Sequence, residues 1–327
     1  MVYLSLGIVL MGMAAALCAV LLVVMARQLL VPPRMTDHKA IYLLKRYSPE
    51  DLGLPFQAMD FVVWDVAAEP IGNTIRIAGW WIPAAIPSSR TVILLHGYSD
   101  AKVGGIAWAP VWRSLGWNVL AIDLRAHGES EGRYSTGGYF EREDIEQIID
   151  QLRQSKPRQT EDLALFGVSL GAACAAAVAV RREDLFAVVL ESPYADFRVA
   201  IRAHGQRLAM PLEWGYGIAY RLAERLARVR FSDVRPLDLV PGVHCPLLMI
   251  HAGQDTFVSP DEIHQLAGAI AKREGGVFSR HIVIDDVQHT MGLLKDPDAY
   301  RQTLLDFIRG VDEAVRTPTA WEATSHG

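Results

Sequence analysis

Residues 163–180 read LALFGVSLGAACAAAVAV: a short apolar run, a Gly-x-Ser-x-Gly pentapeptide and an alanine-rich run. The apolar run is typical of a buried strand, and the alanines favour a helix. Gly167 and Gly171 permit a strained turn between them, which lifts the hydroxyl of Ser169 above the sheet. The helix N-terminus then directs backbone N–H groups and its positive dipole end at that point. This setting predicts that Ser169 is a catalytic nucleophile.

A serine hydroxyl needs a base to take its proton, and the base needs a third group to hold it. Asp255 and His289 each follow closely on an apolar run that predicts a strand. They come in the chain order serine, aspartate, histidine, which is one of the known orders for such a triad. As alternatives, Asp255 is a helix N-cap, or the acid is Asp285 or Asp286. Four other histidines are less suited as the base, because they lie in strands, a helix or earlier loops: His96, His127, His251 and His264.

Acyl transfer also needs donors for the oxyanion of the tetrahedral intermediate. Leu95-His-Gly-Tyr98 ends another apolar run, and its glycine permits a tight turn. We expect the backbone N–H groups of Tyr98 and Leu170 to point together at a carbonyl oxygen. The segment Asp123-Leu-Arg-Ala-His-Gly-Glu-Ser130 is interpreted as a loop held by hydrogen bonds rather than as a catalytic element.

The chain between residues 60 and 315 alternates strand-like and helix-like runs, which predicts an α/β fold with a mostly parallel central sheet and helices on both faces. Alternating runs at 60–66 and 74–82 are expected to be antiparallel entry strands, and short apolar runs the buried parallel strands: 91–95, 118–122, 163–166, 186–190, 247–250 and 281–284. Residues 193–240 interrupt the alternation and predict a small helical cap at the carboxyl edge of the sheet, or a pair of ordinary packing helices.

The N-terminal segment is apolar and carries no charged side chain from Met1 to Ala26. Its length matches the roughly 20 residues that a membrane-spanning helix needs. We therefore expect a membrane anchor at 1–31, a linker at 32–59, the catalytic domain at 60–315 and a tail at 316–327. A chain that starts near Thr36 is expected to keep activity on short-chain esters.

Orientation follows from the basic residues on either side of the apolar segment. Five follow it and none precedes it: Arg27, Arg34, Lys39, Lys45 and Arg46. Because Lys and Arg are enriched on the cytoplasmic side, we expect a single-pass membrane protein with a cytoplasmic catalytic domain. The alternative is a cleaved signal peptide, which would place the enzyme in the periplasm or outside the cell.

Composition excludes several classes of protein. The chain has 327 residues, 51% of them hydrophobic, and a formal net charge of −5, which argues against a disordered chain and against a nucleic-acid partner. Its three cysteines offer no disulfide framework and no zinc-ligand spacing, and the histidines lack partners at ligand spacing. We expect no metal and no cofactor.

Taken as an ordered set, five motifs resemble those of α/β-hydrolases: His96-Gly-Tyr-Ser99, Asp123 to Ser130, Gly167-Val-Ser-Leu-Gly171, Gly253-Gln-Asp255 and Gln288-His289. With the N-terminal anchor, the chain looks most like the membrane-anchored Bem46-like branch, related to the ABHD13 and ABHD17 groups and to serine-aminopeptidase-like hydrolases. The resemblance implies a triad of Ser169, Asp255 and His289 with oxyanion donors at Tyr98 and Leu170. It implies a serine hydrolase that cleaves a carboxylester or thioester of a small or lipid-like acyl substrate. The alternatives are a peptidase or amidase of the serine-aminopeptidase type, and a non-catalytic membrane-anchored binding protein.

Overall fold

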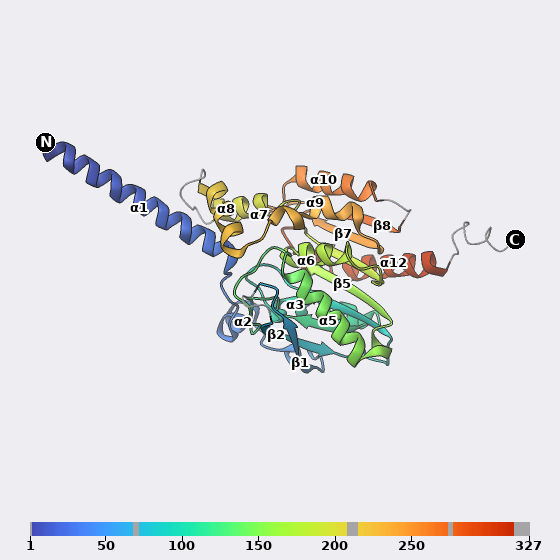
Figure 1. Cartoon of the computed structure of the whole chain (residues 1–327). Coiled ribbons are helices and arrows are strands. Elements are labelled where there is room, and N and C mark those ends of the chain that lie inside the picture. Colours follow the sequence, from blue (N-terminus) through green and yellow to red (C-terminus); the bar gives the residue numbers. More distant parts are fainter. Residues whose placement is uncertain (1, 68–71, 208–214, 274–276, 317–327) are drawn as a thin grey trace.

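One eight-stranded sheet organises the domain. The structure, a computed structural model, describes residues 2–67, 72–207, 215–273 and 277–316 (Figure 1). The strands lie in the order β1-β2-β4-β3-β5-β6-β7-β8. β2 is antiparallel to β1 and β4, and the other neighbouring pairs are parallel. The strands are β1 (Gln57–Trp64), β2 (Thr74–Ile82), β3 (Arg90–Leu95), β4 (Asn118–Ile122), β5 (Asp162–Val168), β6 (Ala187–Glu191), β7 (Leu247–Ala252) and β8 (Ser279–Ile284).

Helices cover both faces of the sheet because the buried strands are apolar on both sides. In β3, Ile93 and Leu95 pack into one core with α5 and α6, whereas Val92 and Leu94 pack into the other core with α4 and α12. The helices are α1 (Val2–Leu30), α2 (Asp37–Leu44), α3 (Lys102–Gly105), α4 (Ala109–Ser114), α5 (Glu141–Ser155), α6 (Leu170–Ala179), α7 (Phe197–Arg207), α8 (Gly215–Ala227), α9 (Pro236–Leu239), α10 (Pro260–Ala271), α11 (Gly292–Lys295) and α12 (Pro297–Arg316).

The residues between β6 and β7 form helices α7, α8 and α9, as expected for a helical insertion. α8 buries Tyr216, Ala219 and Ala223 against α1 and the loop that precedes α5. Figure 1 shows α7 and α8 together at the edge of the domain, beside the end of α1. This insertion is called the cap below.

The N-terminal segment differs from the expected division into an anchor and a linker. α1 projects away from the domain (Figure 1), but its last turns are part of it: Met25, Ala26 and Leu30 are buried in a cluster with α8. The Ser135 N–H donates a hydrogen bond of 2.7 Å to the Leu30 carbonyl. The region expected as a linker contains α2, whose Ala40 packs with Ala101 and Val103. An apolar helix buries its side chains equally well in lipid or in protein, so hydropathy does not mark this boundary.

Candidate active site

Ser169 lies at the turn between β5 and α6 with φ 53° and ψ −109°, a backbone conformation that is strained for a residue with a side chain. The two glycines of the pentapeptide make this turn possible. A Cβ atom at Gly167 would lie 2.1 Å from the Gly171 carbonyl oxygen, and one at Gly171 would lie 2.1 Å from the Leu95 carbonyl oxygen. Only glycine fits either position. Residue 167 packs directly on the backbone of Gly171, and residue 171 packs on the backbone at the end of β3.

The structure brings the three side chains expected as a triad together. His289 Nε2 lies 3.0 Å from Ser169 Oγ, and His289 Nδ1 lies 2.6 Å from Asp255 Oδ2. The Asp255 side chain is fully buried. Its other oxygen accepts hydrogen bonds from the N–H groups of Phe257 and Val258. The N-cap of the following helix, α10, is Ser259, so Asp255 does not have the alternative role of a helix N-cap.

The electrostatics of Asp255 favour a carboxylate. Burial by itself raises the pKa of Asp255, but the hydrogen bond and charge of His289 and the two backbone N–H donors outweigh it and lower the pKa below the ordinary value. An ionised Asp255 holds the Nδ1 proton of His289, which leaves Nε2 as the acceptor toward Ser169.

The alternative bases and acids lie elsewhere. His96 Nε2 accepts a hydrogen bond from the Leu124 N–H. Burial is the main reason that the pKa of His96 lies well below the ordinary value. His251 lies between His281 and the Pro193 carbonyl, and His127 contacts the Arg125 carbonyl. His264 is exposed on α10. Asp285 and Asp286 are exposed, and Asp286 accepts a hydrogen bond from Gln254.

Tyr98 and Leu170, the expected oxyanion donors, line the same cavity as Ser169. A Cβ atom at Gly97 would lie 3.7 Å from the Ser169 Cβ, so the loop after β3 passes directly beside the serine. Leu170 is the first residue of α6, where backbone N–H groups have no partner within the helix. The Tyr98 hydroxyl donates a hydrogen bond of 2.5 Å to the Gln28 carbonyl of α1.

A cavity of about 430 Å³ adjoins Ser169 and His289. Its walls come from three parts of the chain: the loops after the strands, the cap and the end of α1. Most of its lining is apolar, with Phe197 and Ile201 of α7 and Tyr216 of α8 among the cap residues. Met25, Gln28 and Leu29 of α1 also line it. The sequence interpretation missed them because the whole segment to residue 31 was expected to be a membrane anchor.

Asp100 also lines the cavity and was missed; its carboxylate accepts a hydrogen bond of 2.8 Å from the Ala101 N–H. Burial raises its pKa to about 6, although the Ala101 N–H and the charge of Arg46 act in the opposite direction. Among the described residues that line the cavity, Asp100 carries the single acidic side chain. Its position five residues after the end of β3, in the loop that follows a parallel strand, was the feature of the sequence that could have pointed to it.

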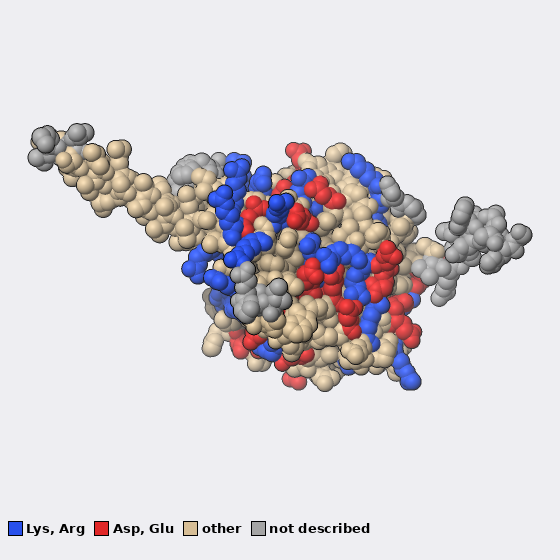
Figure 2. All heavy atoms as spheres, viewed as in Figure 1, with Lys and Arg blue, Asp and Glu red and all other residues tan. Residues whose placement is uncertain are grey.

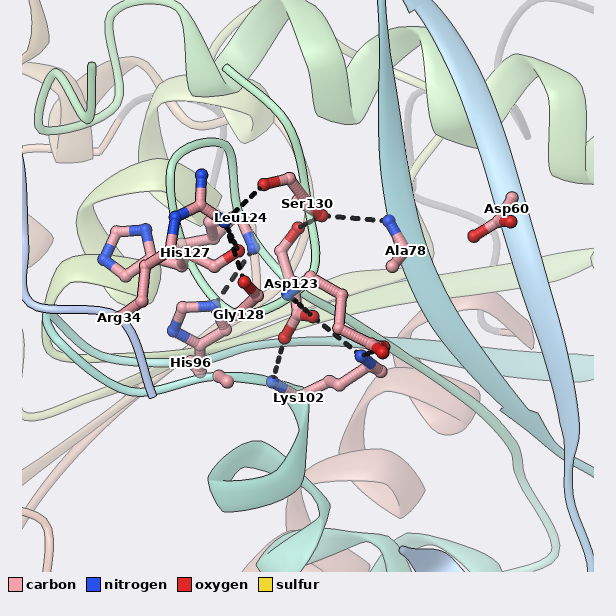
Figure 3. A network of polar contacts seen from close by, with 12 residues as sticks. Arg34, Asp60, Ala78, His96, Lys102, Asp123, Leu124, His127, Gly128 and Ser130 are labelled. Carbon is pink, nitrogen blue, oxygen red and sulfur yellow. Dashed lines mark hydrogen bonds and ion pairs between the residues drawn. The ribbon is translucent and has the colours of Figure 1, made fainter. Parts of the chain in front are cut away.

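The loop after β4 is held by a polar network beside the site (Figure 3). Buried Asp123 binds Lys102 Nζ at 2.7 Å, and its carbonyl accepts a hydrogen bond from the Ser130 hydroxyl. Arg34 reaches from the N-terminal segment and donates hydrogen bonds to the carbonyls of Gly128 and Ser130, both at 2.7 Å. These bonds agree with a loop-fixing role for the segment from Asp123 to Ser130.

Comparisons with known proteins show similarity to hydrolases. A family model described as serine aminopeptidase, S33, matches residues 87–227. The uncharacterized protein YqkD of Bacillus subtilis is 25% identical over 236 residues, covering 69% of this chain and 73% of that protein. Lysophosphatidylserine lipase ABHD12 of Danio rerio is 30% identical over 235 residues, covering 66% of this chain and 59% of that protein.

A solved structure, the esterase Pf2001 of Pyrococcus furiosus, matches with a TM-score of 0.67 and 23% identity, covering 86% of this chain and 97% of that one. The sheet order and this likeness define an α/β-hydrolase fold. The sequence is similar to serine hydrolases of this fold, as the motif series indicated. It carries one N-terminal helix, Ser5–Leu30, that is long and apolar enough for a membrane anchor or a signal sequence.

Proposed function

We propose that the protein is a membrane-anchored carboxylester or thioester hydrolase that acts on an acyl lipid through an acyl-enzyme on Ser169. The observation that carries the proposal is the hydrogen-bonded chain from Ser169 through His289 to buried Asp255. The apolar lining of the adjoining cavity supports an acyl chain as the group that is bound. The similarity to a lysophosphatidylserine lipase supports a lipid substrate of that kind.

The proposed mechanism assigns a role to each of these residues. Ser169 Oγ attacks the carbonyl carbon while His289 Nε2 takes the hydroxyl proton and Asp255 stabilises the imidazolium. The backbone N–H groups of Tyr98 and Leu170 bind the oxyanion, and each such donor contributes about 2.7–4 kcal/mol to the barrier reduction. His289 returns the proton to the leaving alkoxide or thiolate, and water then attacks the acyl-enzyme with His289 again as the base.

A second candidate is an aminopeptidase or amidase. The matching family model is described as serine aminopeptidase, and Asp100 is an acidic residue among those that line the cavity, where it would pair with a substrate ammonium group. Asp100→Asn separates the two candidates. In an aminopeptidase it reduces kcat/KM on aminoacyl anilides far more than on esters, whereas in a lipid esterase both change alike.

Turnover on a panel of esters, thioesters, monoacyl lipids and aminoacyl anilides tests the proposal. We expect hydrolysis of acyl esters by the full-length protein in detergent micelles and a loss of at least about 10³-fold in Ser169→Ala. Ser155→Ala, which changes an exposed serine at the end of α5, is the matched control and is expected to be fully active. Equal turnover by Ser169→Ala and Ser155→Ala would contradict the proposal, and a well-folded protein inactive on the whole panel would favour a binding protein.

A further inference from the structure

The end of the anchor helix is a wall of the catalytic cavity. Met25, Gln28 and Leu29 line the same space as Ser169 and His289, opposite residues of the cap. Met25 is buried and Leu29 is half-buried, and both pack in the cluster with Tyr216 and Ile201. The helix that is apolar enough to enter a bilayer thus also contributes side chains to the site.

Hydrogen bonds from Tyr98, Ser135 and Arg34 hold this wall in place. The Tyr98 hydroxyl binds the Gln28 carbonyl, and the Ser135 N–H binds the Leu30 carbonyl. Immediately after the helix, Arg34 binds the loop after β4 (Figure 3). The wall is therefore attached to the loop beside Ser169 and to the catalytic domain. A site built on a rigid element holds its geometry more closely than one built on a free segment.

The position of the wall along α1 is informative about the substrate. The side chains of Val20 and Val24 are 58% and 44% exposed, whereas Met25 is 6% exposed and Leu30 is fully buried. The buried and half-buried side chains recur at three- and four-residue spacing: Leu21, Leu22, Met25, Ala26, Leu29 and Leu30. They form the face of α1 that packs on the domain, whereas Val20 and Val24 lie on the exposed face. With the outer part of α1 in a bilayer, as proposed above, the cavity lies next to the membrane surface, where the acyl chain of an amphiphile is available.

We infer that Met25 and Leu29 of the N-terminal helix determine which acyl chains the enzyme accepts. This inference rests on the proposed hydrolase function. It also changes the expectation for a chain that starts near Thr36, because that chain lacks one wall of its cavity. Such a chain is expected to lose selectivity for long acyl esters.

Substitutions at Leu29 test the inference. We compare full-length wild type, Leu29→Trp and Leu29→Ala in detergent micelles on p-nitrophenyl esters from two to twelve carbons. Leu29→Trp fills part of the cavity, so the ratio of kcat/KM for the twelve-carbon over the two-carbon ester is expected to fall at least about 10-fold. A substrate that misfits an apolar pocket by one methylene already loses this much in kcat/KM. Leu29→Ala enlarges the cavity, so the optimum is expected to move to longer chains. Val24→Trp, on the same helix but facing outward, is the control and is expected to keep the wild-type ratio.

The outcomes distinguish this inference from the proposed function. If wild-type protein hydrolyses no ester, the proposed function fails and the inference fails with it. If wild type is active but Leu29→Trp and Leu29→Ala both keep its chain-length profile, the inference alone is overturned. If thermal unfolding shows that Leu29→Trp is not folded, the test depends on Leu29→Ala and on whether its optimum ester chain length becomes longer. A shift in Val24→Trp equal to that in Leu29→Trp would also overturn the inference, since it would come from the membrane segment as a whole.

Discussion

Asp255 is held at both carboxylate oxygens, by His289 on one side and by two backbone N–H groups on the other. An asparagine fits this site but cannot fix the Nδ1 proton of His289. We therefore expect Asp255→Asn to fold normally and to lose about 10³- to 10⁴-fold in kcat. Asp285→Asn, an exposed carboxylate on the same edge of the sheet, is the control and is expected to retain full activity. Steady-state kinetics on one ester measures both, and a larger loss in Asp285→Asn would show that the acid is misassigned.

Glu191 gives the folded state a pH dependence of its own. Burial raises its pKa to about 7 from 4.5, against the opposing hydrogen bond from the Tyr300 hydroxyl. Between these pH values the folded protein keeps a proton that the unfolded chain has released, so the free energy of unfolding falls as pH rises through this range. Glu191→Gln has no carboxyl group to titrate. The variant is therefore expected to avoid the loss of up to about 3 kcal/mol in the free energy of unfolding that wild type undergoes as the pH rises.

Guanidinium denaturation of wild type and Glu191→Gln at pH 5 and pH 8 measures this difference. We expect the variant to be no more stable than wild type at pH 5 and clearly more stable at pH 8, with its amide still able to accept the Tyr300 hydrogen bond. The same change in stability with pH in both proteins would show that Glu191 does not titrate as described.

At the scale of elements, the turn between β5 and α6 depends on close approach to β3. Gly171→Ala places a Cβ atom 2.1 Å from the Leu95 carbonyl oxygen, so the strand and helix have to separate. We expect a loss of stability of at least about 3 kcal/mol, at the upper end for overpacking, together with loss of activity. Gly268→Ala in α10 is the matched control, since nothing lies within 4 Å of its Cβ position, and it is expected to gain about 0.5–1 kcal/mol. Thermal unfolding decides, and equal midpoints for the two variants would contradict this account.

The elements show how far the sequence predicts the structure. Apolar runs locate the strands because a strand buried on both faces has to be apolar throughout, and β4 matches its expected range fully. Gly-x-Ser-x-Gly predicts the turn because sterics there admit only glycine. The contact between Tyr98 and Gln28 was beyond prediction, since it joins residues 70 positions apart through a backbone carbonyl. The place of Met25 in the cavity was also unpredictable, because an apolar side chain packs equally well against lipid or protein.

At the scale of the whole molecule, the N-terminal helix has two parts with different surroundings. Its outer part exposes apolar side chains along its length and projects from the domain (Figure 1), whereas its last turns are buried against the cap. Figure 2 shows Lys and Arg side chains gathered where the helix meets the domain.

Removal of the helix as a signal peptide would take away Met25 and Ala26 and expose the cap residues against which they pack. We therefore expect the mature protein to retain residues 1–30, to stay in the membrane pellet after carbonate washing and to be released by detergent. Intact mass and fractionation measure this. A mature chain that begins after residue 26, or release by carbonate, would contradict membrane anchoring by this helix.

The central claim is that Ser169 forms the covalent intermediate. Full-length protein is labelled with a fluorophosphonate, digested with trypsin and mapped by mass spectrometry. Ser169 is the single serine of the tryptic peptide that spans residues 159–181. The account predicts one label per chain, located on this peptide and absent from His289→Ala, in which the serine is no longer activated. A label on another peptide, or an unlabelled 159–181 peptide in protein that hydrolyses esters, would contradict it.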